Sequence, residues 1–142
     1  CTWIMAYPGE QLKHLKTSVA FILWQQNFWT KGHEQGTPTF ERLRDGVNRK
    51  MFTATAYPGT EMWKVVRKDL KRHFDIEYDS LGDPICDDNF HKYVLELDDA
   101  TKILNDKDGE PVNFGGMPMD KFLQAREHID NDEIEKILEM RE

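Results

Sequence analysis

The sequence predicts an α+β fold with N-terminal helices, a small, mostly antiparallel sheet and C-terminal helices. Two observations lead to this prediction. Apolar residues recur every three or four positions up to Phe74, as in helices, and from Phe74 onward apolar and acidic residues alternate, as in a strand. With 142 residues and 16.7 kDa, the chain has the length of one domain with one core. We therefore expect residues 1–142 to form a single domain.

Three helices are expected in the first half. A Pro-Gly pair precedes the first helix, whose apolar positions run from Leu12 to Trp29. Because so many of its residues are apolar, we expect this helix to be largely buried. Thr37 and Pro38 are typical of an N-cap and a first helical turn, so they open the second helix. The third helix covers residues 60–73.

The third helix has the clearest amphipathic pattern. One stripe is apolar and consists of Trp63, Val66, Leu70 and Phe74. The opposite side is cationic and consists of Lys64, Arg67, Lys68, Lys71 and Arg72. Like charges at this spacing repel one another, so an anionic group is expected nearby. The candidates are a nucleic-acid backbone, an acidic partner and the chain's own second half.

Charge divides the chain into a basic helical half and an acidic mixed half. Residues 1–74 hold 12 Lys or Arg against 6 Asp or Glu, whereas residues 75–142 hold 7 against 20, which makes the net charge −7. One interpretation is that the halves neutralise each other inside the fold. The other is a charge-bipolar surface that attracts partners of opposite charge.

Strands and two short helices are expected in the second half. In chain order these are strands at 74–79 and 93–97, a hairpin that pairs 102–104 with 111–114, and helices at 118–128 and from 131 to the end. The residues between the first two strands are expected to form a loop. Gly109 supplies the positive φ that the hairpin turn requires.

Asp75, Glu77 and Asp79 are the best candidates for catalysis. Alternate residues of a strand project to one side, so Asp75 and Glu77 could share a Mg²⁺ or Mn²⁺ ion there. The local string Phe-Asp-Ile-Glu resembles the first acidic motif of proofreading 3′–5′ exonucleases, in which an Asp and a Glu two positions apart bind the metals. The later motifs of that family, a Tyr or His shortly before another Asp, do not follow at the expected spacing. The alternative is an edge strand whose acidic face discourages aggregation.

The chain contains four tryptophans, of which two lie near the end of the first helix. Trp24 and Trp29 are five positions apart, which is about 140° around a helix, so they cannot both face the core. One of them is expected at the surface. We select Trp29 as a binding residue, since exposed aromatic area beside basic residues favours interfaces.

Compartment signals are few. With only Cys1 and Cys86, a reducing compartment such as the cytoplasm is favoured. The longest apolar run, from Val19 to Trp24, is far shorter than the roughly 20 residues that span a bilayer, so no membrane association is expected. Because the first residue is Cys1 rather than Met, we expect a processed product, with a removed leader as an open alternative.

The favoured function is a non-catalytic binding protein, such as an accessory or inhibitory factor, that uses the charge-bipolar, aromatic-bearing surface. Its partner would be another protein, and it would need no cofactor. The first alternative is a metal-dependent nuclease or phosphoesterase that uses Asp75, Glu77 and Asp79. A further alternative is non-catalytic nucleic-acid binding through the basic helix at 60–73. The sequence does not indicate an oligomeric state.

Overall fold

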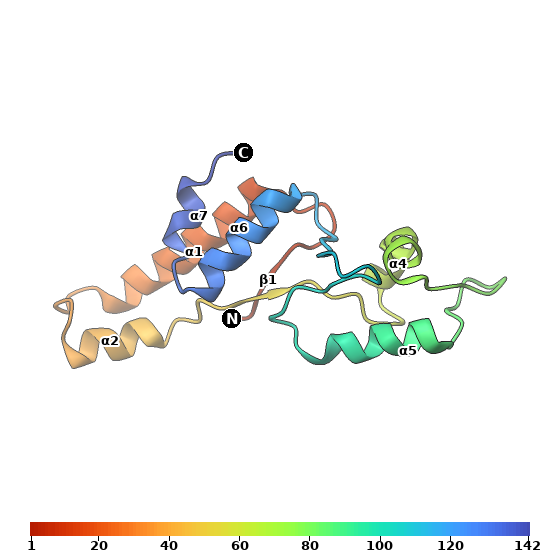
Figure 1. Ribbon diagram of the computed structural model, residues 1–142. Coiled ribbons are helices and arrows are strands. Elements are labelled where there is room, and N and C mark those ends of the chain that lie inside the picture. The colour runs from red at the N-terminus through yellow and green to blue at the C-terminus, as the bar shows by residue number, and fades with distance from the viewer. The chain divides into compact units, whose positions relative to one another are not determined.

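The computed structural model describes residues 1–142 as an α+β chain dominated by helices (Figure 1). The elements are β1 (Trp3–Met5), α1 (Leu12–Thr30), α2 (Pro38–Asp45), β2 (Met51–Thr53), α3 (Glu61–Val65), α4 (Arg67–Phe74), α5 (Asp88–Leu95), the 3₁₀ turn η1 (Glu96–Asp98), α6 (Met119–Asp130) and α7 (Glu135–Glu139). None of the helices combines the length and the apolar character that crossing a membrane requires.

The only sheet is a parallel pair, β1 and β2, so the prediction of a mostly antiparallel sheet in the second half is wrong. Both strands belong to the first 53 residues of the chain, and α1 and α2 lie between them in sequence. A helical connection of this length returns the chain to the same end of the sheet, which is the usual way that parallel strands are joined.

The chain divides into two compact units, which do not follow the boundary between the basic and acidic halves. The first unit consists of Cys1–Trp3, Glu10–Met51 and Met117–Glu142, and the second of Ile4–Gly9 and Phe52–Gly116. Each unit therefore contains segments from both sides of Phe74. The prediction that residues 1–142 form one domain stays a prediction.

Helices α1, α2, α6 and α7 form the first unit. α1 packs against α2 and α7, and α6 packs against α7 (Figure 1). The buried apolar residues of this unit include Leu12, Leu15, Val19, Ile22, Met51, Met117, Phe122, Ala125, Ile129, Ile134, Ile137 and Met140. Predicted burial of Leu15, Val19 and Ile22 is confirmed. The prediction that α1 is largely buried is wrong, because only one of its faces is covered.

Two arginines connect separate segments of the first unit. Arg126 is buried and donates to the Met51 carbonyl at 2.7 Å, and it also pairs with Asp130 one turn further along α6. Arg49 pairs with Asp132 at 2.7 Å and with Glu135 at 2.8 Å. These bonds connect the start of β2 with α6, and the segment before β2 with the α6–α7 connection and the start of α7.

The second unit has a compact apolar core. It consists of Ala54, Ala56, Met62, Trp63, Val66, Leu70, Phe74, Ile76, Tyr93, Leu104, Val112 and Phe114. Trp63, Val66, Leu70 and Phe74 are all part of it, so the predicted apolar stripe of the third helix is confirmed. That helix begins near residue 60 as expected, with Thr60 as its N-cap, but it is interrupted at Val66, where α3 ends and α4 begins. A pair of β-branched residues, Val65 and Val66, disfavours a regular helix at this point.

Residues 74–79 do not form the predicted strand. Asp75 ends α4 in the left-handed conformation with φ 55°, and the chain continues as a loop in which only Tyr78 makes a β-bridge, with Pro84. A left-handed residue changes the direction of the chain, so the alternation of apolar and acidic residues belongs to a helix end followed by a loop. Ile76 is nevertheless fully buried.

The predicted strand at 93–97 is the end of helix α5 and the turn η1. Asp87 caps α5, since its carboxylate accepts from the Phe90 N–H at 3.0 Å. Short apolar runs fit a helix and a strand equally well, and in this case the cap and the three-residue spacing of Phe90 and Tyr93 select the helix.

The predicted hairpin is a tight turn with a single antiparallel bridge, between Asn105 and Pro111. Gly109 has the expected positive φ, 81°. Of the two closing helices, α6 matches its prediction closely. The last helix is shorter than expected, because the left-handed Asp132 (φ 57°) turns the chain before α7 starts at Glu135.

Candidate functional site

The three carboxylates selected from the sequence do not form a common site. The Asp75 carboxylate pairs with Lys107 at 2.6 Å, and Glu77 pairs with Lys71 at 3.0 Å. The Asp79 carboxylate accepts from the backbone N–H groups of Leu81 and Asp83, both at 2.9 Å. Each carboxylate thus has a different partner. Nowhere in the chain do three His, Cys, Asp or Glu side chains gather in a group that could hold a metal ion.

Most of the predicted basic surface is paired within the second unit. Lys64 pairs with Glu61 at 2.6 Å and Arg72 with Asp69 at 3.0 Å, one helical turn away in each case. Lys71 pairs with Glu77, as described above. Arg67 does not extend into solvent, because its guanidinium lies over the Tyr78 ring, 5.0 Å from the centroid. Among these five cations, Lys68 alone makes neither an ion pair nor a ring contact. Two of these three ion pairs lie within the basic half itself, and only the Lys71–Glu77 pair joins it to the acidic half.

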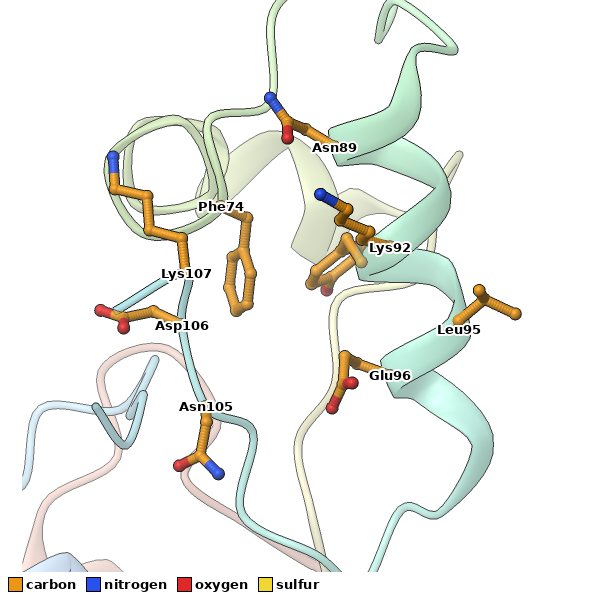
Figure 2. A pocket seen from close by; sticks show the side chains of 9 residues that line it. Phe74, Asn89, Lys92, Leu95, Glu96, Asn105, Asp106 and Lys107 are labelled. Carbon is orange, nitrogen blue, oxygen red and sulfur yellow. The ribbon is translucent and has the colours of Figure 1, made fainter. Parts of the chain in front are cut away.

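A pocket of about 470 Å³ lies between α5 and the loop that follows Leu104 (Figure 2). It is lined by Phe74, Asn89, Lys92, Tyr93, Leu95, Glu96, Asn105, Asp106 and Lys107. The Phe74 and Tyr93 rings meet edge to face with their centroids 4.8 Å apart. The Tyr93 hydroxyl is not available to a ligand in the pocket, because it donates a hydrogen bond to the buried Ala56 carbonyl at 2.6 Å.

Three of the four charged residues of this pocket, Glu96, Asp106 and Lys107, are paired with neighbours. His73 bonds Asp106 through Nδ1 at 3.1 Å, and this bond holds the pKa of the Asp106 carboxyl below its usual value. Lys107 pairs with Asp75, which raises the pKa of Lys107, and Glu96 pairs with Lys102 at 3.3 Å. These contacts organise the loop around Asp106. No nucleophile with an adjacent base faces the pocket, so its geometry does not indicate a reaction.

The most distinctive surface lies on the other unit, where five aromatic side chains follow one another in contact. We call them the aromatic row; they are Trp3, Phe21, Trp24, Phe28 and Trp29. Successive ring centroids lie 5.8, 5.5, 5.7 and 5.7 Å apart. The four residues on α1 are exposed: Phe21 by 47%, Trp24 by 58%, Phe28 by 59% and Trp29 by 58%.

Helix α1 is therefore apolar on two opposite faces. Its inner face, which includes Leu15, Val19 and Ile22, is fully buried. Phe28 follows Val19 by nine positions, which is about 900°, or half a turn away from the buried face. That angle is the signal in the sequence that could have placed the row at the surface. Trp24 and Trp29 do not both face the core, as expected; both of them, and not one alone, reach the surface.

Two small hollows lie beside Trp29. One, of about 170 Å³, is lined by Trp29, Arg42, Leu43, Gly46 and Val47. The other has the same volume of about 170 Å³ and is lined by Cys1, Trp3, Gln25, Trp29, Gly46, Val47 and Asn48. Trp29, the one aromatic residue selected from the sequence for binding, thus stands between two concave patches at the end of the row.

The stacking of the rings limits what the row can bind. Phe21, Trp24 and Phe28 stack on one another with interplanar angles of 25° and 26°. Their faces are already used, and a flat ligand would need ring centroids about 7 Å apart, twice the contact distance, in order to enter between them. The row consequently offers an apolar ridge rather than separate stacking platforms.

Comparisons with protein-family models, with curated proteins and with solved structures give no match for this chain.

Proposed function

We propose that this chain is a non-catalytic binding protein, an accessory or inhibitory factor, that docks a partner protein on the aromatic row of α1. The observation that carries the proposal is the second apolar face of α1. An apolar helix face normally packs against the rest of the protein, and only one of the two apolar faces of α1 is covered. Contiguous exposed apolar surface on a folded protein is typical of interaction sites.

The composition of the surface supports a protein partner. Tryptophan, tyrosine and arginine are the residue types that dominate binding energy at protein interfaces, particularly where a large ring lies beside a pocket. The row contributes Trp24 and Trp29, and the hollows next to Trp29 are the right size to accept single side chains. Arg42 lines one of these hollows.

Photo-crosslinking tests this proposal. The phenylalanine analogue p-benzoylphenylalanine replaces Phe28 in one sample and Val65, which is 67% exposed in the second unit, in the control. After irradiation in the source cells, we expect discrete protein adducts from position 28 and none from position 65. The adducts should disappear when Phe21→Gln and Trp24→Gln are added, while circular dichroism stays unchanged. Equal adducts at the two positions, or adducts that survive the double substitution, would contradict the proposal.

A further inference from the structure

The cations around the aromatic row indicate the charge of the partner that binds there. Helix α1 contains no Asp or Glu, and Lys13 lies near its start with Lys31 directly after its end. Lys13 precedes Trp24 by eleven positions and Lys31 follows it by seven, so each lies within about 20° of Trp24 around the helix. The exposed ridge is thus bordered at both ends by an ammonium group on its own side.

A third cation lies beside the row. Arg42, on α2, shares a hollow with Trp29. The acidic residues near it on α2, Glu41 and Asp45, are already paired with Arg44, at 2.7 Å and 3.2 Å. Lys13, Lys31 and Arg42 make no ion pair within 4 Å. Unpaired charges of one sign at the border of an apolar surface favour a partner of the opposite sign.

The same charges disfavour a second copy of this chain. Two α1 helices packed antiparallel through their rows would place Lys31 of each copy beside residue 18 of the other, on a helix that carries Lys13 and Lys16. Since α1 has no carboxylate, no ion pair between the helices could compensate. An anionic membrane is disfavoured as well, because the first unit carries twelve acidic residues against eleven basic ones. A lipid surface also has no side chains that would fill the hollows beside Trp29.

We propose that the segment docking on the aromatic row is an amphipathic helix of a partner protein, with an apolar stripe that lies on the ridge and Asp or Glu residues on its flanks. This inference rests on the proposed function. A ridge of stacked rings fits the groove between the side-chain rows of a facing helix. The apolar stripe covers Phe21, Trp24 and Phe28, one of its side chains enters a hollow beside Trp29, and the flanking carboxylates meet Lys13, Lys31 and Arg42.

Two synthetic peptides serve as probes. Both are 18-residue amphipathic helices with the same Leu stripe; one has Glu on its flanks and the other has Lys. Fluorescence anisotropy measures the binding of each labelled peptide to the full chain at low and at high salt. We expect the Glu-flanked peptide to bind about five- to tenfold more tightly at low salt, and the preference to shrink as salt screens the charges. Exchanging Lys13→Glu, Lys31→Glu and Arg42→Glu should reverse the preference, whereas Lys64→Glu with Lys68→Glu should leave it unchanged.

Further outcomes of the peptide experiment distinguish a failure of this inference from a failure of the proposed function. Equal affinity for both peptides, or a preference that the triple exchange does not alter, overturns the acidic partner. If the Phe21→Gln, Trp24→Gln and Phe28→Gln variant then loses both peptides, the row still stands as the docking surface. If that variant binds as the original chain does, the proposed function fails too. Dimers in sedimentation, or co-sedimentation with phosphatidylserine vesicles, that this variant abolishes would assign the row to a second copy or to a membrane instead.

Discussion

The Trp24 and Phe28 rings stack one helical turn apart on α1, with their centroids separated by 5.7 Å and their planes by 26°. Both side chains remain more than half exposed. Stacking thus holds the two rings in place without removing them from water. Rings held in this way lose little further freedom when a partner covers them, which favours tight binding.

Removing the stacked rings should affect binding far more than stability. The variant with Trp24→Ala and Phe28→Ala loses three ring contacts, and we expect the free energy of unfolding to fall by about 1.5 kcal/mol, because exposed pairs contribute near the lower limit of about 0.5 kcal/mol each. Ile22→Ala on the buried face should cost about 2–5 kcal/mol. Urea denaturation measures both. A double variant as unstable as Ile22→Ala would mean that the row belongs to a core.

The core of the second unit should be sensitive to Leu70. Leu70 is fully buried, and we expect Leu70→Ala to lower the free energy of unfolding by about 2–5 kcal/mol through lost burial and the cavity left behind. Val65→Ala, at an exposed position two residues after Trp63, serves as the control and should change stability by less than about 0.5 kcal/mol. Comparable losses for the two variants in chemical denaturation would contradict the observed orientation of α3 and α4.

Acid should loosen the loop around Asp106. Because the hydrogen bond with His73 lowers the pKa of Asp106 in the folded chain, the carboxylate stabilises the fold above its ordinary pKa, and that contribution is lost as the pH falls through the lowered value. Asp106→Asn keeps an oxygen for the N–H groups of Asp108 and Glu110 but removes the charge. We therefore expect the variant to lose less stability than the original chain as the pH falls from about 5 to 2. If the thermal midpoints of the two proteins fall equally as the pH is lowered, the contact between His73 and Asp106 contributes nothing to stability.

The cations of α3 and α4 should bind nucleic acid poorly. Lys64, Lys71 and Arg72 are paired with acidic neighbours, and the chain's net charge of −7 repels phosphates at long range. On immobilised duplex DNA at near-physiological salt, we expect no retention of the chain. Retention that disappears in the Lys68→Ala, Lys71→Ala variant, with the fold unchanged, would revive the alternative of a nucleic-acid-binding surface.

Local patterns made part of this fold predictable. Thr37 caps a helix as expected because an N-cap depends on residues only three positions away. The stripe from Trp63 to Phe74 faces the core because its spacing alone determines which side of a helix it occupies. The turn at Gly109 depends only on the conformation of one glycine.

Features that depend on distant residues were not predictable in this way. The parallel pairing of β1 with β2 joins segments separated by two helices, and nothing local in either three-residue strand specifies its partner. Asp75 and Glu77 alternate with apolar residues as in a strand, yet their partners, Lys107 and Lys71, lie on other segments and draw the two carboxylates apart. The aromatic row was missed because aromatic residues usually complete a core, so the first helix was expected to be largely buried.

Hydroxyl-radical footprinting of the aromatic row, read by mass spectrometry, tests the proposed docking surface most directly. It compares the rate of oxidation of Phe21 and Trp24 in the isolated chain with the rate in the complex captured by crosslinking at position 28. We expect fast oxidation of both rings in the isolated chain and strong protection in the complex, while the exposed Leu95 of the second unit reacts equally in both. Slow oxidation of the rings in the isolated chain, or protection that spares them in the complex, would contradict the assignment of the aromatic row as the binding surface.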